Sequence, residues 1–288
     1  MTSSDPPPLW RRPAGVTGGI WRYTHQRSIA DHYDDFVADT PLCKLDADIV
    51  SRYLPPLNPL PLTVEKAVDS GEKTAQKNHA ADRPIVVDLG CGTGRIAWPL
   101  AENGYDVIGV DLSRPMLQTM LAKRQAMKTD AAGSVHALEA NLVQLGGLRD
   151  DIADHAVCLF STLGMIHGRQ NRRETLRHAA RIVRSGGTLI VHVHRRWAAF
   201  REPTGCRRLL RSWWNSIRNS GDEFGDAVYA YRGLSDMFMH RFSWRELSTD
   251  LRECGWRLGD THWVALDGRT VVSRAWDASG MIMTASAT

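Results

Sequence analysis

The sequence lacks the features that mark several broad classes of protein. Its five cysteines are odd in number, widely spaced and free of any Cys-x-x-Cys pair, which argues against a disulfide framework and against a zinc site. No apolar run approaches the roughly 20 residues needed to span a bilayer. The N-terminal MTSSDPPPLW has neither the basic nor the apolar region of a secretory signal. We therefore expect a cytoplasmic protein without a transmembrane segment.

A large excess of charge of one sign is also missing. The 36 Lys and Arg residues are nearly balanced by 32 Asp and Glu residues, which leaves a formal net charge of +4 at pH 7. Such a mildly basic chain is compatible with an anionic ligand but does not require nucleic acid as a partner. Hydrophobic residues make up 43% of the 288 residues, so the chain can bury the core of one large domain.

Composition divides the chain into four expected parts. Residues 1–62 are predicted to form an N-terminal helical extension, because apolar residues recur at helical spacing between 28 and 54. Residues 63–84 are low in aromatic residues and are expected to be a linker or surface insertion. Residues 85–277 are expected to form the main domain, with a cap insertion at 195–241, and residues 278–288 a C-terminal tail.

From residue 85 onward, short apolar runs alternate with helical patterns. The expected strands are 85–89, 106–110, 135–139, 156–161, 188–194, 256–264 and 270–276, and the expected helices are 94–103, 115–127, 171–184 and 244–254. This alternation predicts an α/β fold with a doubly wound, mostly parallel sheet of seven strands.

A glycine-rich turn stands where the first expected strand meets the first expected helix. Residues 86–94 read VVDLGCGTG. Glycines there permit a sharp turn and the close approach of a ligand, and the helix that follows offers free N–H groups. The spacing is G-x-G-x-G, and Arg95 stands where a dinucleotide-binding fingerprint has its third glycine.

Two acidic residues narrow the choice of ligand. Asp88 lies two residues before the first glycine, where a carboxylate can receive an ammonium group, which methionine has and nicotinamide nucleotides lack. Asp111 ends the second expected strand, 21 residues after Gly90, where an acid can accept hydrogen bonds from both ribose hydroxyls.

With these two motifs, VVDLGCGTG and GVDLSRPML (109–117), the chain resembles the class I S-adenosylmethionine-dependent methyltransferases, in the group that includes quinone-biosynthesis and tRNA wobble-uridine enzymes. The similarity continues through FSTLGMIHG (160–168), IVRSGGTLIV (182–191) and FSWRELSTDLRECGW (242–256). The resemblance implies a Rossmann-like fold, S-adenosyl-L-methionine as cofactor and methyl transfer as activity. The cofactor-binding residues that it implies are Tyr33, Asp88, Gly90, Cys91, Gly92, Gly94, Asp111, Leu112, Met116, Asn141, Leu142 and Ser161.

The methyl acceptor stays open between a small molecule, which we favour, and RNA, with a tRNA wobble-uridine enzyme or a catalytically silent binding module as alternatives. Methyl transfer needs a base only if the acceptor is not already a nucleophile. His167, after the fourth strand, is the candidate general base, and His194, at the end of the fifth, the candidate for substrate contact. His192 is expected to be a core histidine bonded to backbone, so we expect no metal site.

Residues 195–218 contain seven arginines and one acidic residue, interleaved with four aromatic residues. Three interpretations compete for this segment. It could contact RNA through phosphates and stacked bases, or lie on anionic lipid as an amphipathic helix. Alternatively, it is an ordinary cap helix whose aromatic residues pack on the domain while its arginines face water.

Overall fold

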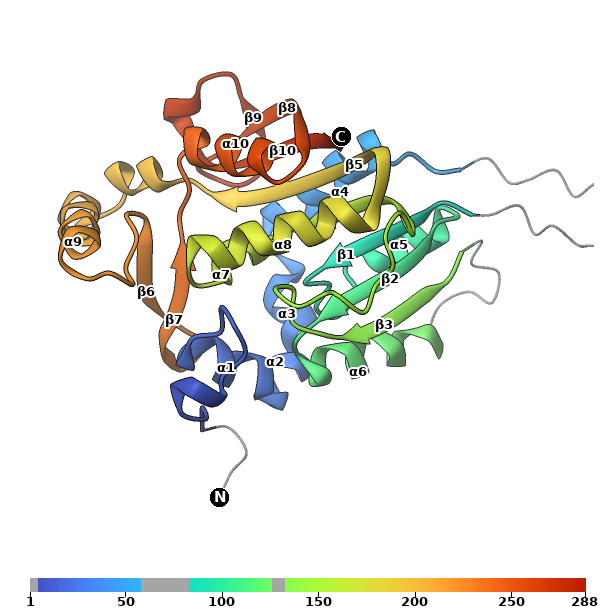
Figure 1. Cartoon of the computed structure of the whole chain (residues 1–288), viewed down its shortest axis with the longest axis horizontal. Coiled ribbons are helices and arrows are strands. Elements are labelled where there is room, and N and C mark those ends of the chain that lie inside the picture. The colour runs from blue at the N-terminus through green and yellow to red at the C-terminus, as the bar shows by residue number, and fades with distance from the viewer. Residues whose placement is uncertain (1–4, 58–82, 126–132) are drawn as a thin grey trace, which may run out of the picture.

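The computed structural model describes residues 5–57, 83–125 and 133–288 and contains a central sheet with helices on both faces (Figure 1). The sheet has eight strands in the order β3-β2-β1-β4-β5-β10-β8-β9. The strands are β1 Ile85–Leu89, β2 Asp106–Asp111, β3 Val135–Glu139, β4 Ala153–Cys158, β5 Val183–His194, β8 Trp256–Ala265, β9 Val271–Val272 and β10 Ala278–Ala287. The α/β prediction is thereby confirmed.

Among the described residues, four helices precede β1 and the others lie between strands. The helices are α1 Gly18–His25, α2 Arg27–Asp31, α3 Tyr33–Ala38, α4 Pro41–Tyr53, α5 Ala97–Glu102, α6 Arg114–Ala122, α7 Thr162–Met165, α8 Arg169–Ile182, α9 Gly205–Arg218 and α10 Trp244–Glu253, with short 3-10 turns η1 Leu9–Arg11, η2 Lys123–Gln125, η3 Arg196–Arg201 and η4 Ala275–Asp277. None of the helices in the described ranges has the length and apolar character needed to cross a membrane.

Strands β1 to β5 run parallel, and the direction of winding reverses between β1 and β4. In open α/β sheets, ligands bind in the crevice that such a reversal leaves at the carboxyl ends of the strands. The carboxyl ends of β1 and β2 carry the glycine turn and Asp111, so the topology places both predicted binding elements at this crevice.

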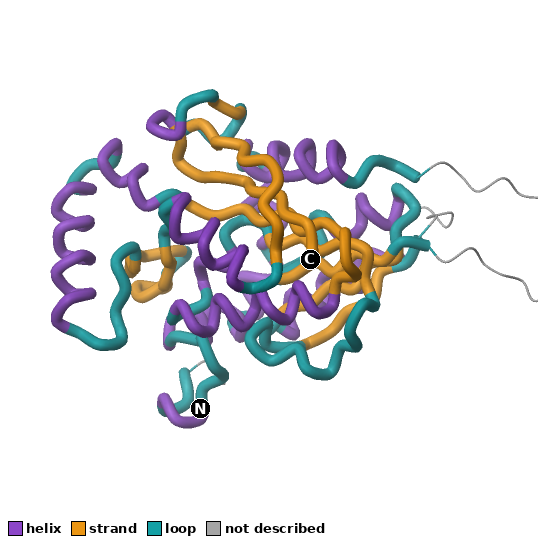
Figure 2. The backbone as a smooth tube through the Cα atoms, turned by 45° about the horizontal axis from the view of Figure 1, so that its top comes forward, coloured by secondary structure: helices purple, strands orange, loops and turns teal. Residues whose placement is uncertain are grey.

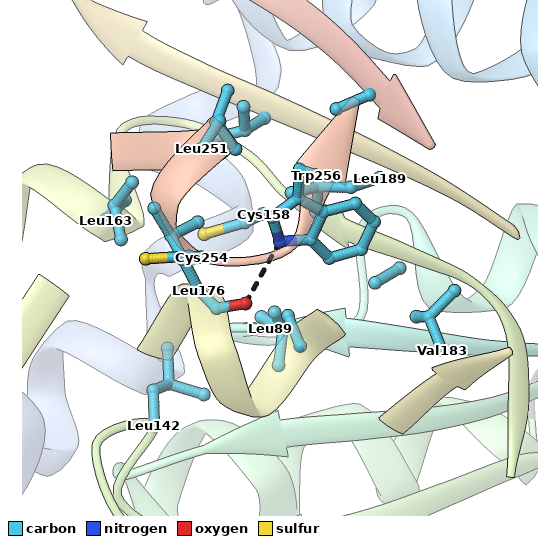
Figure 3. Packing of buried hydrophobic residues seen from close by; sticks show 14 of the residues in the cluster. Leu89, Leu142, Cys158, Leu163, Leu176, Val183, Leu189, Leu251, Cys254 and Trp256 are labelled. Carbon is cyan, nitrogen blue, oxygen red and sulfur yellow. Dashed lines mark hydrogen bonds between the residues drawn. The ribbon is translucent and has the colours of Figure 1, made fainter. Parts of the chain in front are cut away.

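One face of the sheet is covered by α8 and α10. Trp256 is buried there among Leu176, Leu189 and Leu251, and its indole Nε1 donates a hydrogen bond of 3.0 Å to the backbone oxygen of Leu176 (Figure 3). A buried indole N–H needs such an acceptor, and this one ties the start of β8 to α8.

The opposite face is covered by α4, α5 and α6. Leu45 and Ile49 of α4 and the following Leu54 pack in one cluster with Val264 and Ile282 from β8 and β10. The predicted N-terminal extension therefore supplies part of the core of the sheet, and α4 belongs to the main domain in packing terms.

Two sequence predictions need correction, and a third lies almost entirely outside the described residues. Residues 278–288, expected to be a tail, contain β10, which runs antiparallel between β5 and β8. The sequence ASGMIMTASA is rich in small residues and poor in β-branched ones, so its strand conformation comes from its neighbours rather than from propensity. The strand expected at 270–276 shrinks to β9. The linker predicted at 63–84 lies outside the described residues except for its last two positions.

Residues 196–240, between β5 and α10, add η3, α9 and a hairpin of β6 Asp226–Tyr231 and β7 Leu234–His240, which forms a separate two-stranded sheet (Figure 2). Arg232 and Gly233 make the hairpin turn, both with positive φ, as a two-residue turn of this type requires. Strand β7 packs on α1 at Gly19, where a Cβ would lie 2.0 Å from the backbone oxygen of Asp236.

Candidate active site

A cavity opens at the carboxyl ends of β1, β2 and β4 and collects most of the predicted cofactor residues. Its lining is Ala14, Gly15, Val16, Ile20, Tyr23, Thr24, Tyr33, Asp88, Gly90, Cys91, Gly92, Arg95, Ile96, Asp111, Leu112, Ser113, Met116, Asn141, Leu142, Leu159, Phe160, Thr162, Met165 and Ile166. Ten of the twelve residues predicted to bind the cofactor are among them. The exceptions are Gly94 and Ser161.

The glycine turn is shaped by two different constraints. At Gly90, φ is +81° and a Cβ would lie 2.3 Å from Cγ2 of Thr162, so a larger residue would collide with α7. At Gly92, φ is +54° and the nearest atom to a Cβ position is Cε1 of Tyr33, at 3.9 Å. The turn therefore leaves open space beside Gly92, which a ligand can approach closely.

Asp111 closes the other side of the turn. Its carboxylate accepts hydrogen bonds from the backbone N–H groups of Gly92 (2.9 Å) and Ser113 (2.7 Å). Burial raises the pKa of Asp111, and these backbone donors oppose the rise. The side chain is held at the cavity wall by main-chain bonds, in the position where the sequence predicts contact with a ribose.

Asp88 is the deepest charged group of the cavity, with 4% of its surface exposed. Burial raises its pKa to about 7, an effect that the nearby Arg95 guanidinium opposes and the Asp111 carboxylate adds to. A carboxylate in this position gains from a cationic ligand, because an ammonium group would offset the cost of its burial.

Arg95 is a cavity residue whose surroundings the sequence does not reveal. Its Nη1 donates to the backbone oxygen of Cys43 (2.8 Å) and its Nη2 to Asp46 (3.0 Å). Asp46 is fully buried and also contacts Nδ1 of His192 at 2.7 Å. Burial by itself would raise the pKa of Asp46, but His192 and Arg95 outweigh it and lower that pKa. His192 is thus a core histidine, as expected, but its partner is a carboxylate.

The N-terminal helices cover the cavity. Tyr33 lines it from the start of α3, while the neighbouring Asp34 accepts a hydrogen bond from Thr93 (2.6 Å) and pairs with Lys123 (2.6 Å). Burial raises the pKa of Tyr33 above its ordinary value, so its hydroxyl stays protonated at neutral pH. The start of α3 is therefore joined directly to the glycine turn through Asp34 and Thr93.

Asn141 holds residues 14–16, the first covering segment of the cavity, and is not a free side chain. Its Nδ2 donates to the backbone oxygen of Ala14 (2.9 Å), and its Oδ1 accepts from the N–H of Val143 (3.1 Å). One lone pair of Oδ1 is left for a ligand. A second bond, from the N–H of His167 to the backbone oxygen of Gly15 (2.9 Å), holds the same segment.

Gly94 and Ser161 occupy positions different from those predicted. A Cβ at Gly94 would lie 2.5 Å from Cγ of Met120, so this glycine permits the packing of α6 against the turn. Ser161 is fully buried, and its hydroxyl accepts the backbone N–H of His194 (3.0 Å). Phe160, its neighbour, lines the cavity instead, and both residues have positive φ. Such backbone strain clusters at functional sites, but no local sequence signal indicates it here.

The two histidines predicted to be catalytic lie away from the cavity lining. His167 follows Ile166 but faces a second pocket, where its ring packs edge-on against Phe238. His194 faces a third pocket on the α4 side, and burial lowers its pKa to about 4. These positions argue against the catalytic roles predicted for both residues.

Two groups of side chains in the described ranges have metal-ligand spacing, His167 with Asp222 and Asp226, and Glu223 with His240 and Glu246. Within these groups His240 contacts Asp226 through Nδ1 (2.6 Å) and Glu246 through Nε2 (2.8 Å). The buried guanidinium of Arg172 also pairs with Glu223. The side chains of the second group are therefore engaged in hydrogen bonds and ion pairs, and Asp226 of the first group is engaged by His240.

Comparison with known proteins agrees with this geometry. The family model described as "Methyltransferase domain" matches residues 87–191, which carry the glycine turn and Asp111. Residues 87–191 of the chain therefore carry a methyltransferase domain.

Curated relatives match only part of this chain. The putative methyltransferase YqeM of Bacillus subtilis is 29% identical over 109 residues, 38% of this chain and 42% of that protein. The chain spans less than half the length of the curated relatives it matches.

Two solved structures share the fold. The CcbJ methyltransferase of Streptomyces caelestis has a TM-score of 0.60 at 21% identity, covering 92% of this chain and 99% of that one. The 1,6-didemethyltoxoflavin-N1-methyltransferase of Burkholderia thailandensis, solved with 1,6-didemethyltoxoflavin and S-adenosylhomocysteine, has a TM-score of 0.55 at 17% identity, covering 96% and 93%. Both structural alignments extend over segments of this chain outside residues 87–191.

Proposed function

We propose that this protein transfers a methyl group from S-adenosylmethionine to a small-molecule acceptor. The observation that carries the proposal is the placement of Asp88, the glycine turn and Asp111 around one cavity at the switch point of the sheet. The open space beside Gly92 and the buried Asp88 carboxylate fit a ligand that has both an amino-acid end and a nucleoside end.

Each end of such a cofactor meets a matching part of the cavity. Asp111 would hold the ribose hydroxyls, and Asp88 would face the ammonium group. Leu112, Met116 and Leu142 offer an apolar surface for the adenine ring. These assignments keep the charged groups of the ligand opposite protein charges and its flat ring against apolar side chains.

When bound, the cofactor supplies a sulfonium methyl group: a lone pair of the acceptor forms a bond to the methyl carbon as the carbon–sulfur bond breaks and leaves its electron pair on sulfur. The chain contributes mainly position and a dry environment. Tyr23 and Tyr33 both line the cavity, and burial raises the pKa of each. They therefore act as hydrogen-bond donors at neutral pH, and an acceptor with a free lone pair needs no base.

The enclosure of the cavity favours a small acceptor over RNA. Residues 14–16, α1 and α3 contribute to its lining together with the glycine turn, so the described part of the chain forms a cavity there rather than a flat surface on which a polymer could lie. The arginine-rich segment also offers fewer free charges than its sequence suggests. Arg196 pairs with Glu246, Arg201 with Asp277 (2.9 Å) and Arg208 with Glu202, while Arg195 donates to the backbone oxygen of Ala278 (3.0 Å).

Calorimetric titration of the full chain with S-adenosylmethionine, S-adenosylhomocysteine and NADH tests the cofactor assignment. We expect micromolar binding of the first two and none of NADH. Turnover is then tested by incubating the protein with methyl-labelled cofactor and separate pools of small metabolites and tRNA. Label in the metabolite pool supports the proposal, and label in tRNA alone would replace it with the wobble-uridine alternative. Cofactor binding without label in either pool would favour a silent binding module.

A further inference from the structure

Helix α9 has an apolar stripe that the protein does not cover. Leu210, Trp213, Trp214 and Ile217 follow the spacing i, i+3, i+4, i+7, which places them on one side of a helix. Their exposed fractions are 64%, 45%, 46% and 62%. Of the three interpretations of this segment, the one in which its aromatic residues pack on the domain therefore does not hold for Trp213 and Trp214 of α9.

The helix is attached to the protein through a different side. Gly205 and Leu209 are its buried residues, and a Cβ at Gly205 would lie 1.6 Å from the backbone oxygen of Ala199 in η3. Ser212 accepts the N–H of Gly225 (3.0 Å) before the hairpin. These contacts orient α9 so that its apolar stripe points away from the rest of the described chain.

Positive charge borders the stripe. Helix α9 contains four arginines and no acidic residue. Arg208 pairs with Glu202, but Arg207, Arg211 and Arg218 have no carboxylate partner within the residues that the structure describes. At helical spacing these three arginines fall on one flank of the stripe. Arg218 also lies over the ring of Trp214, with its guanidinium carbon 4.5 Å from the ring centre.

We propose that α9 docks the protein on an anionic lipid surface. An amphipathic helix of this kind lies in the interface plane, with its apolar side among the acyl chains and its basic residues near the headgroups. Tryptophan suits this boundary because its ring is apolar and its N–H is polar. Juxtamembrane arginines are attracted by anionic headgroups.

Two other occupants fit the surface less well. A second copy packed on the stripe by two-fold symmetry would bring the same arginine flanks together, with no acidic residue on α9 to neutralise them. Single-stranded nucleic acid would stack on the tryptophans, but Leu210 and Ile217, the most exposed residues of the stripe, provide aliphatic surface rather than stacking platforms. Lipid satisfies the apolar and the charged part together.

Helix α9 is separate from the cofactor cavity, because none of its residues is among those that line the cavity. Helix α9 lies at one end of the molecule, with the hairpin between it and α1, whereas α6 and β3 lie toward the other end (Figures 1 and 2). The inference does not depend on the proposed methyl transfer, since neither the stripe nor its arginines line the cavity.

Co-sedimentation of the full chain with vesicles tests the proposal. We use phosphatidylcholine vesicles with and without about 30% phosphatidylserine. The variants are Trp213→Ser with Trp214→Ser, and Arg207→Gln with Arg211→Gln and Arg218→Gln. The control is Trp276→Ser, which removes an exposed tryptophan outside α9. Thermal unfolding of each variant identifies any loss of fold.

The wild type and Trp276→Ser should partition onto anionic vesicles and much less onto neutral ones. The arginine variant should lose about a hundredfold in partitioning, roughly fivefold for each charge, and the tryptophan variant at least about tenfold. Absence of binding to anionic vesicles would overturn the proposal, as would equal binding by all folded variants. Self-association that the tryptophan variant abolishes would assign the stripe to a second copy instead.

Discussion

The two walls of the cofactor cavity are built in different ways. The wall at the glycine turn is held by bonds close to the strands themselves: Gly90 and Cys91 donate to the backbone oxygen of Val110 (2.7 and 3.1 Å), and Gly92 donates to Asp111. The covering wall, residues 14–33, is held by a few long-range bonds. One runs from the hydroxyl of Ser113 to the backbone oxygen of Thr24 (2.6 Å).

Because of this difference, the two walls can recognise different ligands. The first wall recognises groups that every S-adenosylmethionine molecule has, and its residues form motifs in the sequence. The second wall is set by the particular helices that precede the domain, so it is the part of the cavity that can select an acceptor. The predictions below begin with a buried residue that supports the cavity from α4 and then test each wall.

The largest effect is expected for Asp46→Ala. Asp46 connects α4 to Arg95 of the cavity and to His192 of β5, and its loss leaves a buried guanidinium without its carboxylate partner. We expect the free energy of unfolding to fall by about 3–5 kcal/mol, measured by urea denaturation. Asp48→Ala, at an exposed position of the same helix, is the control and should change it by less than about 0.5 kcal/mol. Equal effects of the two substitutions would contradict this stabilising role of Asp46.

Asp111→Ala should weaken S-adenosylmethionine binding by about a hundredfold. The substitution removes the charged acceptor of the two hydrogen bonds that we propose from the ribose hydroxyls. Calorimetry measures the change in Kd. Glu139 aligns with Asp111 on the neighbouring strand β3 but is exposed and outside the cavity, so Glu139→Ala is the matched control. Unchanged affinity in a folded Asp111→Ala variant would remove the ribose assignment.

Asp88 predicts a pH dependence of cofactor binding. Its pKa of about 7 in the free protein should fall when an ammonium group binds beside it, so binding releases a proton below pH 7. As the pH is raised toward 7, the affinity for the cofactor should increase by up to about tenfold per pH unit, and above pH 7 it should level off. Asp88→Asn should bind about tenfold more weakly at pH 8 and lose this pH dependence. A wild-type affinity that is constant from pH 5.5 to 8 would argue against contact with the ammonium group.

The same two walls explain how far the sequence could be used to predict the site. Asp88, Gly92 and Asp111 are correctly placed at the cavity because strand ends and positive-φ glycines leave local signals. Arg95 and Phe160 were not predicted, since their roles depend on α4 and on the backbone after β4. The strand β10 was missed for a related reason: its conformation is imposed by β5 and β8 on either side.

A smaller effect is expected at the covering wall. Asn141→Ala removes the bond to Ala14 that fixes the first covering segment. We expect the dissociation rate of the cofactor, measured by stopped-flow fluorescence, to rise about fivefold through the loss of one hydrogen bond. Asn219→Ala, which breaks an exposed bond to Asp222, should leave this rate unchanged. If both variants release the cofactor alike, the covering segment does not retain it.

The smallest effect is expected for His167→Ala, which tests whether the histidine that holds the covering wall takes part in the chemistry. The imidazole of His167 faces the pocket beyond Ile166 and packs on Phe238, while its backbone N–H, which the substitution keeps, holds Gly15. We expect kcat to change by less than about threefold, well below the effect of removing a general base. A loss of about a hundredfold or more in kcat, with an unchanged Kd for the cofactor, would mean that the imidazole reaches the acceptor when the covering segment moves. His167 would then regain the role that its sequence position suggests.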